Sequence, residues 1–74
     1  VDGLDYEPLY QAVRSLKENY RMVVELYYFQ ELSVHEISQV LHLSISNVKV
    51  ILMRGRRQLR EILEKEGYHN EDFQ

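Results

Sequence analysis

The sequence predicts an all-α protein: a small domain of four helices that contains a helix-turn-helix. Apolar residues recur every three to four positions along most of the chain, which is the period of a helix with one buried face. Glycine and proline, which interrupt helices, account for only three residues and one residue of the 74. No segment is a strand candidate.

We expect the first helix at about residues 6–15. Asp5 is a good N-cap, and Pro8 falls in the first turn, where its missing N–H breaks no hydrogen bond. One face carries apolar residues at i, i+4 and i+7, namely Leu9, Val13 and Leu16. This pattern predicts an amphipathic helix.

The second helix is expected at about residues 17–29. Ser15 and Glu18 have the spacing of a capping box, in which each side chain accepts a hydrogen bond from the other residue's backbone N–H. Tyrosines recur at helical spacing in the first two helices. This spacing favours partly buried core tyrosines over an exposed platform on which bases stack.

A short third helix is expected over residues 34–41, because Ser33 and Glu36 form a second capping-box pattern. Its apolar side is formed by Val34, Ile37 and Leu41. A tight connection then leads to Ser44, which we expect to cap the next helix. Two helices joined by a turn of three to four residues form the helix-turn-helix motif.

The fourth helix is expected over residues 45–65, with Gly67 as its stop signal. At about 100° per residue, apolar and polar side chains separate onto opposite sides. The apolar side comprises Ile45, Val48, Ile51, Leu52, Gly55, Leu59, Ile62 and Leu63. The other side comprises Ser46, Lys49, Val50, Met53, Arg57 and Arg60, with Arg54 and Arg56 at its edges.

These faces predict a single core within one domain that covers residues 1–74. We expect the core to contain Val13, Leu16, Val23, Leu26, Ile37, Leu41, Val48, Leu52 and Leu59. A chain of this length buries only about 60% of its unfolded surface, so modest stability is expected. Because the chain begins with Val1 and not Met, we expect it to be part of a longer protein.

The charge of the chain is unevenly distributed. The net charge is −3, yet residues 33–60 carry five basic and one acidic side chain. Residues 1–32 carry three basic and six acidic side chains, and residues 61–74 carry one basic and five acidic. The basic segment coincides with the predicted helix-turn-helix, which favours contact with nucleic acid over a merely solvated helix face.

Recognition helices of helix-turn-helix proteins contact bases through their N-terminal residues. Asn pairs with adenine, Lys reaches guanine acceptors, and an apolar side chain contacts the thymine methyl. We therefore predict base contacts by Ser46, Asn47, Lys49 and Val50. Contacts to the DNA backbone are predicted for Ser33, Ser44, Arg54, Arg56, Arg57 and Arg60.

Other classes of function find little support in these residues. His35 and His42 lack a thiol or a suitably spaced carboxylate to complete a metal site, and no nucleophile is paired with a base. We therefore expect no metal, no cofactor and no enzymatic activity. No apolar run approaches the roughly 18 residues of a membrane span, so no membrane insertion is expected. The lack of cysteine and of a signal-peptide pattern favours a cytoplasmic location.

Residues 31–61, ELSVHEISQVLHLSISNVKVILMRGRRQLRE, resemble region 4, the C-terminal domain of bacterial sigma-70 family sigma factors, and in particular its extracytoplasmic-function (ECF) group. Upstream, LKENYRMVVELYYF resembles the preceding helix of that family. The resemblance implies a winged-helix-like domain without strands, which binds the promoter −35 element while docked on the β-subunit flap of RNA polymerase. By position, Ser44, Asn47 and Lys49 fall where the family contacts DNA.

The chain departs from the family pattern at Ser38, His42, Ile51 and Gly55, where Ala, Gly, Arg and Ala are usual. Together with Val50 and Met53, Ile51 makes the fourth helix more apolar and less cationic than the pattern. ECF sigma factors are typically held inactive by anti-sigma proteins, so Val50 and Met53 are a candidate face for such a partner. The alternative to a DNA-binding sigma domain is therefore a helix-turn-helix used mainly for protein association, in a sigma-like or a non-sigma regulator.

Overall fold

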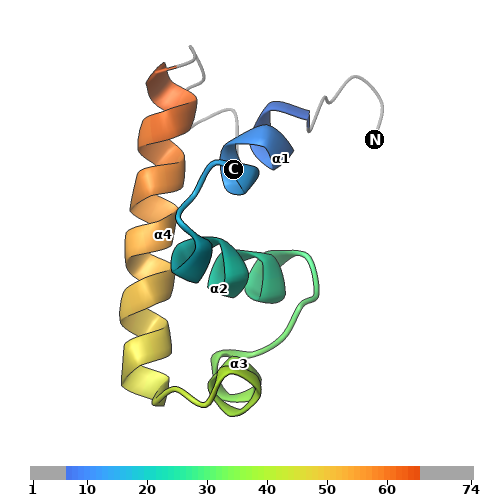
Figure 1. Cartoon of the computed structure of the whole chain (residues 1–74), viewed down its shortest axis with the longest axis vertical. Helices are drawn as coiled ribbons and strands as arrows, with labels where there is room; N and C mark the ends of the chain where they lie inside the picture. The colour runs from blue at the N-terminus through green and yellow to red at the C-terminus, as the bar shows by residue number, and fades with distance from the viewer. Residues whose placement is uncertain (1–6, 66–74) are drawn as a thin grey trace.

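The computed structural model describes residues 7–65, which form four α-helices in the expected order (Figure 1). The helices are α1 (Glu7–Arg14), α2 (Glu18–Tyr28), α3 (Val34–Leu41) and α4 (Ile45–Lys65). Every boundary lies within one residue of its expected position. None of residues 7–65 forms a strand, and the all-α class is confirmed. The predicted cap at Asp5 and stop at Gly67 lie outside the described residues.

The long helix α4 is the element against which the other three pack. Its 21 residues span roughly 31 Å at about 1.5 Å per residue. Figure 1 shows α3 beside its N-terminal end, α2 beside its middle and α1 beside its C-terminal half, all on one side. Within residues 7–65, no other helix packs against the opposite side of α4, which we call its open side.

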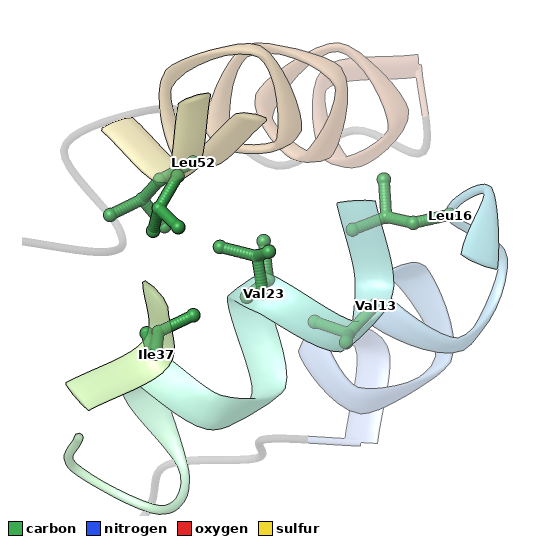
Figure 2. Packing of buried hydrophobic residues seen from close by; sticks show 7 residues of the cluster. Val13, Leu16, Val23, Ile37 and Leu52 are labelled. Atoms are coloured by element: carbon green, nitrogen blue, oxygen red, sulfur yellow. The ribbon is translucent and has the colours of Figure 1, made fainter. Parts of the chain in front are cut away.

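A cluster of buried aliphatic side chains joins all four helices (Figure 2). Its buried members are Val13, Leu16, Val23, Val24, Ile37, Val48 and Leu52. Six of these were predicted as core from the sequence, while the other predicted members, Leu26, Leu41 and Leu59, are half-buried and pack against the cluster. Ala12 and Leu63 are also buried. The predicted single core is thus confirmed, with a partly exposed rim.

Gly55 is buried where α4 crosses α2. A Cβ atom at this position would lie 3.0 Å from Val24 Cγ2 and 3.4 Å from Tyr20 Cβ. The first distance is shorter than most contacts of real Cβ atoms, so any side chain here would have to displace its neighbours. Glycine lowers helix propensity by about 1 kcal/mol relative to alanine, but here it allows two helices to approach closely.

The two predicted caps of the helix-turn-helix are present. Ser33 Oγ accepts a hydrogen bond from the Glu36 N–H (3.0 Å), and Glu36 Oε1 accepts one from the Ser33 N–H (2.9 Å). Ser44 Oγ accepts a hydrogen bond from the Asn47 N–H (3.0 Å). These bonds fix the start of α3 and the start of α4, and the second of them also holds the α4 side of the turn that joins the two helices.

The capping box predicted at Ser15 and Glu18 is wrong. The Ser15 hydroxyl donates instead to the Ala12 carbonyl (2.7 Å), and the N-cap of α2 is Lys17, which makes no side-chain capping bond. The physical reason is competition: α1 ends immediately before Ser15, and the carbonyls of its last turn are available to accept from the hydroxyl. The sequence pattern alone does not show whether the serine hydroxyl bonds to the end of α1 or caps the start of α2.

His42 occupies the left-handed conformation that usually favours glycine, with φ 58° and ψ 43°. The backbone N–H groups of His42 and Leu43 both donate to the Ser38 carbonyl, the latter at 3.0 Å. This closes α3 as a glycine C-cap would. Histidine is among the residues enriched at positive φ, so the departure from the family pattern preserves the turn.

Two predictions about individual side chains are partly or wholly wrong. Ile45, placed on the apolar side of α4, is 40% exposed, because side chains in a first turn point back beyond the helix end. Tyr20 and Tyr27 are half-buried as predicted. Tyr10 and Tyr28 are instead 47% and 44% exposed, since they lie beside the apolar faces of their helices and not on them.

Candidate nucleic-acid interface

The open side of α4 carries a row of side chains spaced at i, i+4, i+7 and i+11. We call these residues, Ser46, Val50, Met53 and Arg57, the outer row. All four are exposed, and they lie opposite the buried residues Val48, Leu52, Gly55 and Leu63. The outer row is polar at its N-terminal end, apolar in the middle and cationic at its C-terminal end.

Basic side chains lie along both edges of the outer row. At about 100° per residue, Arg54 and the polar Asn47 lie on one edge. Lys49, Arg56 and Arg60 lie on the other edge, and all five side chains are exposed. A narrow face with cations on both edges is complementary to a DNA groove, in which bases form the floor and phosphates line both walls.

This arrangement refines the sequence prediction for Asn47 and Lys49. Both residues were expected to contact bases near the start of α4. They lie on opposite edges of the outer row, so they face different walls of a groove. We therefore expect them to contact different base pairs and not a single shared pair.

The predicted backbone-contacting serines lie at the starts of two helices. Each hydroxyl oxygen of Ser33 and Ser44 accepts a hydrogen bond from a backbone N–H three residues further on. Because a hydroxyl also carries one donor proton, each serine can still donate to a phosphate oxygen while it caps its helix. Both residues are exposed, so capping does not prevent the predicted role.

Apart from Lys65 in its last turn, the basic residues of α4 lie between Lys49 and Arg60. These two residues are roughly 17 Å apart along the helix axis. Beyond Arg60 the exposed charges include Glu61 and Glu64, which repel phosphate. From this charge pattern we expect any DNA contact by α4 to involve only about its first four turns.

Ile51 does not belong to the outer row. It is half-buried and packs against the core cluster. An arginine at this position, as the family usually has, would lie at the margin between core and solvent. The exposed apolar residues of the outer row are therefore Val50 and Met53, without Ile51.

The sequence did not predict an exposed aromatic pair formed by Tyr10 of α1 and Phe29 at the end of α2. Their ring centroids are 5.2 Å apart, with 49° between the ring planes. Phe29 is 37% exposed. The sequence does contain one signal for this pair: both residues are aromatic, although they fall outside the apolar faces of their helices. Such a pair, on helices that pack against the inner side of α4, is a second candidate contact surface.

Residues 7–65 contain no group of three or more His, Asp or Glu side chains arranged to hold a metal ion. No helix within this part of the chain is both long and apolar enough to span a bilayer.

Comparison with known proteins agrees with this geometry. The family model "Sigma-70, region 4" matches residues 6–59, which include α1 to α3 and most of α4. The chain belongs to the sigma-70 region 4 family. The resemblance noted in the sequence is thereby confirmed, and this region 4 domain is of the DNA-binding, helix-turn-helix class and not of an enzyme class.

Several sigma factors of Bacillus subtilis (strain 168) are similar to this region 4 domain. ECF RNA polymerase sigma factor SigW is 40% identical over 53 residues, which are 72% of this chain and 28% of SigW. ECF RNA polymerase sigma factor SigM is 36% identical over 56 residues, 76% of this chain and 34% of SigM. RNA polymerase sigma-D factor is 39% identical over 57 residues, 77% of this chain and 22% of that protein. The chain thus spans about a third of the length of these relatives, or less.

Proposed function

We propose that this domain belongs to a longer sigma factor, recognises the promoter −35 element and docks on the β-subunit flap of RNA polymerase. The observation that carries this proposal is the open side of α4, where polar and apolar side chains are flanked by cations on both edges. Asn47 and Lys49 would contact base edges. Ser33, Ser44 and the four arginines Arg54, Arg56, Arg57 and Arg60 would contact phosphates and position the helix.

Docking on polymerase requires a surface that remains accessible when α4 lies on DNA. The exposed pair Tyr10 and Phe29 supports this part of the proposal, because α1 and α2 pack on the inner side of α4 (Figure 1). Tyrosine and phenylalanine are enriched in the buried centres of protein interfaces. The flap would then hold the domain over the −35 element, and tethering would raise the effective DNA concentration.

Promoter binding by polymerase reconstituted with the full parent sigma factor tests the proposal. The holoenzyme should bind a duplex selected from a randomised −35 library more tightly than a scrambled duplex with the same −10 element. Equal binding to both would contradict −35 recognition. Tyr10→Ala/Phe29→Ala should weaken binding to the isolated β flap, and unchanged flap binding would contradict the assignment of that surface.

The second candidate function is protein association through α4, with an anti-sigma protein as the partner. The observation in its favour is that Val50 and Met53 are apolar and 36% and 51% exposed. Salt dependence separates the two functions. Phosphate contacts make affinity fall steeply with salt concentration, whereas an apolar protein interface responds little.

A further inference from the structure

The outer row of α4 contains an apolar pair in a strongly cationic setting. Val50 and Met53 are neighbours on one face, three residues apart, and both are exposed. Arg54 lies on one edge of the pair, and Lys49 and Arg56 lie on the other. Exposed apolar side chains contribute nothing to the core, and they replace the polar groups that a DNA-reading helix uses for hydrogen bonds.

The size and the charge of this surface favour DNA over a protein as its ligand. A stable protein interface buries about 800 Å² on each partner, far more than two partly exposed side chains provide. The surrounding exposed charges between Lys49 and Arg60 are all positive, which matches a polyanion. In the major groove, one base substituent is apolar, the C5-methyl group of thymine.

The spacing of the pair also fits DNA. Residues three apart on a helix differ by about 4.5 Å along its axis. Successive nucleotides of a DNA strand advance by about 3.4 Å. A helix lying in the groove therefore brings Val50 and Met53 to neighbouring base pairs and not to a single pair.

We propose that Val50 and Met53 select thymine by contact with the methyl groups of two neighbouring base pairs in the −35 element. This inference rests on the proposed function and adds its chemical specificity. Thymine is favoured because its methyl group buries apolar surface against the pair. Other bases are rejected because Val50 and Met53 cannot make hydrogen bonds to their polar edges, which would lose water without compensation.

Replacement of thymine by deoxyuridine tests this proposal, because it removes the methyl group and leaves base pairing unchanged. Polymerase reconstituted with the full parent sigma factor is assayed on the selected −35 duplex, with each thymine replaced in turn. At two neighbouring base pairs, each replacement should lower affinity about two- to fourfold, as expected for the loss of one partly buried methyl group. At other positions it should have little effect.

Two variants connect the methyl effect to the residues. In Val50→Ala, replacement of thymine by deoxyuridine should no longer lower affinity at one of the two base pairs, because the contact between the side chain and the methyl group is already lost. In Met53→Ala the same should hold at the other base pair. The matched control is Val40→Ala on α3, an exposed valine outside the outer row, which should keep both effects. Thermal unfolding should be unchanged in all three variants, since all three side chains are exposed.

The possible results separate this inference from the proposed function. If no deoxyuridine replacement matters while the selected duplex is still preferred over a scrambled one, −35 recognition stands and the thymine proposal is wrong. If no duplex is preferred, the proposed function itself fails and the inference fails with it. If Val50→Ala and Met53→Ala leave DNA binding unchanged but weaken binding of a purified anti-sigma protein, the pair is a protein contact and the inference is overturned.

Discussion

The inner and outer sides of α4 use similar residue types for different purposes. Val48 is completely buried on the inner side, whereas Val50, two positions later, is 36% exposed on the outer row. Leu52 is 7% exposed, whereas its neighbour Met53 is 51% exposed. The 3.6-residue period of the helix alone produces this contrast, because adjacent residues point about 100° apart.

The contrast teaches that angular position on α4, and not hydrophobicity, decides what a substitution does. The inner side of α4 packs against α1, α2 and α3, so a change of side-chain volume there disturbs the packing of the core. On the outer side, the described part of the chain packs nothing against α4. We therefore expect inner substitutions to lower stability, and outer substitutions to alter DNA binding in a folded protein.

The largest expected effect is that of Leu52→Ala. Removal of this buried side chain should lower the free energy of unfolding by about 2–5 kcal/mol, because the core cannot fully close the cavity. Chemical denaturation of the domain measures the change. The adjacent variant Met53→Ala is the control and should change stability by no more than about 0.5 kcal/mol. Equal losses in the two variants would mean that the two sides of α4 are wrongly assigned.

The second prediction concerns Gly55, where α4 and α2 approach closely. Gly55→Leu should destabilise the domain by about 1–3 kcal/mol, because the new side chain must displace Val24 and Tyr20. Leucine has a helix propensity close to that of alanine, so a loss cannot come from the helix itself. Gly55→Ala is the control and should cost less than Gly55→Leu, because both gain helix propensity but alanine adds only the Cβ atom and so displaces Val24 less. Leucine tolerated without loss of stability would contradict the close helix contact.

Much of the fold follows from the sequence because local signals agree with one another. Ser33 and Glu36 begin α3 as predicted, since no helix end lies close enough to compete for the Ser33 hydroxyl. Ser15 has the same pattern but bonds to Ala12, because α1 ends beside it. Helix periodicity is a local property, but the choice between two neighbouring helix ends depends on the three-dimensional turn.

Less of the candidate site follows from the sequence. The exposed side of α4 was predictable from periodicity, as were its arginines. That Gly55 is needed depends on the distance between α4 and α2, which the sequence does not show. The pairing of Tyr10 with Phe29 joins residues from two helices and required the tertiary structure. The DNA-contacting residues stay predictions.

The third prediction tests the polar part of the outer side. Asn47→Ala should cost about 1–3 kcal/mol on the preferred −35 duplex and little on scrambled DNA, because a base-specific hydrogen bond is lost. The Asn47 side chain takes no part in capping α4, since Ser44 Oγ accepts its backbone N–H. Stability should therefore remain unchanged. Competition binding by the holoenzyme measures both affinities, and equal losses on the two duplexes would show that Asn47 does not read bases.

The smallest expected effect is that of Arg57→Ala, at the cationic end of the outer row. Here α4 would leave the groove, so the guanidinium group would contact a phosphate and not a base. All sequences should lose affinity alike, by about fivefold at physiological salt, and the slope of log K against log salt concentration should fall by about 0.9. Salt titrations of the holoenzyme on cognate and scrambled duplexes measure both quantities. Arg57→Lys is the matched control and should keep the slope, because it keeps the charge. A loss confined to the cognate duplex would instead assign base reading to Arg57, and would extend the sequence-reading part of the outer side to the full length of the row.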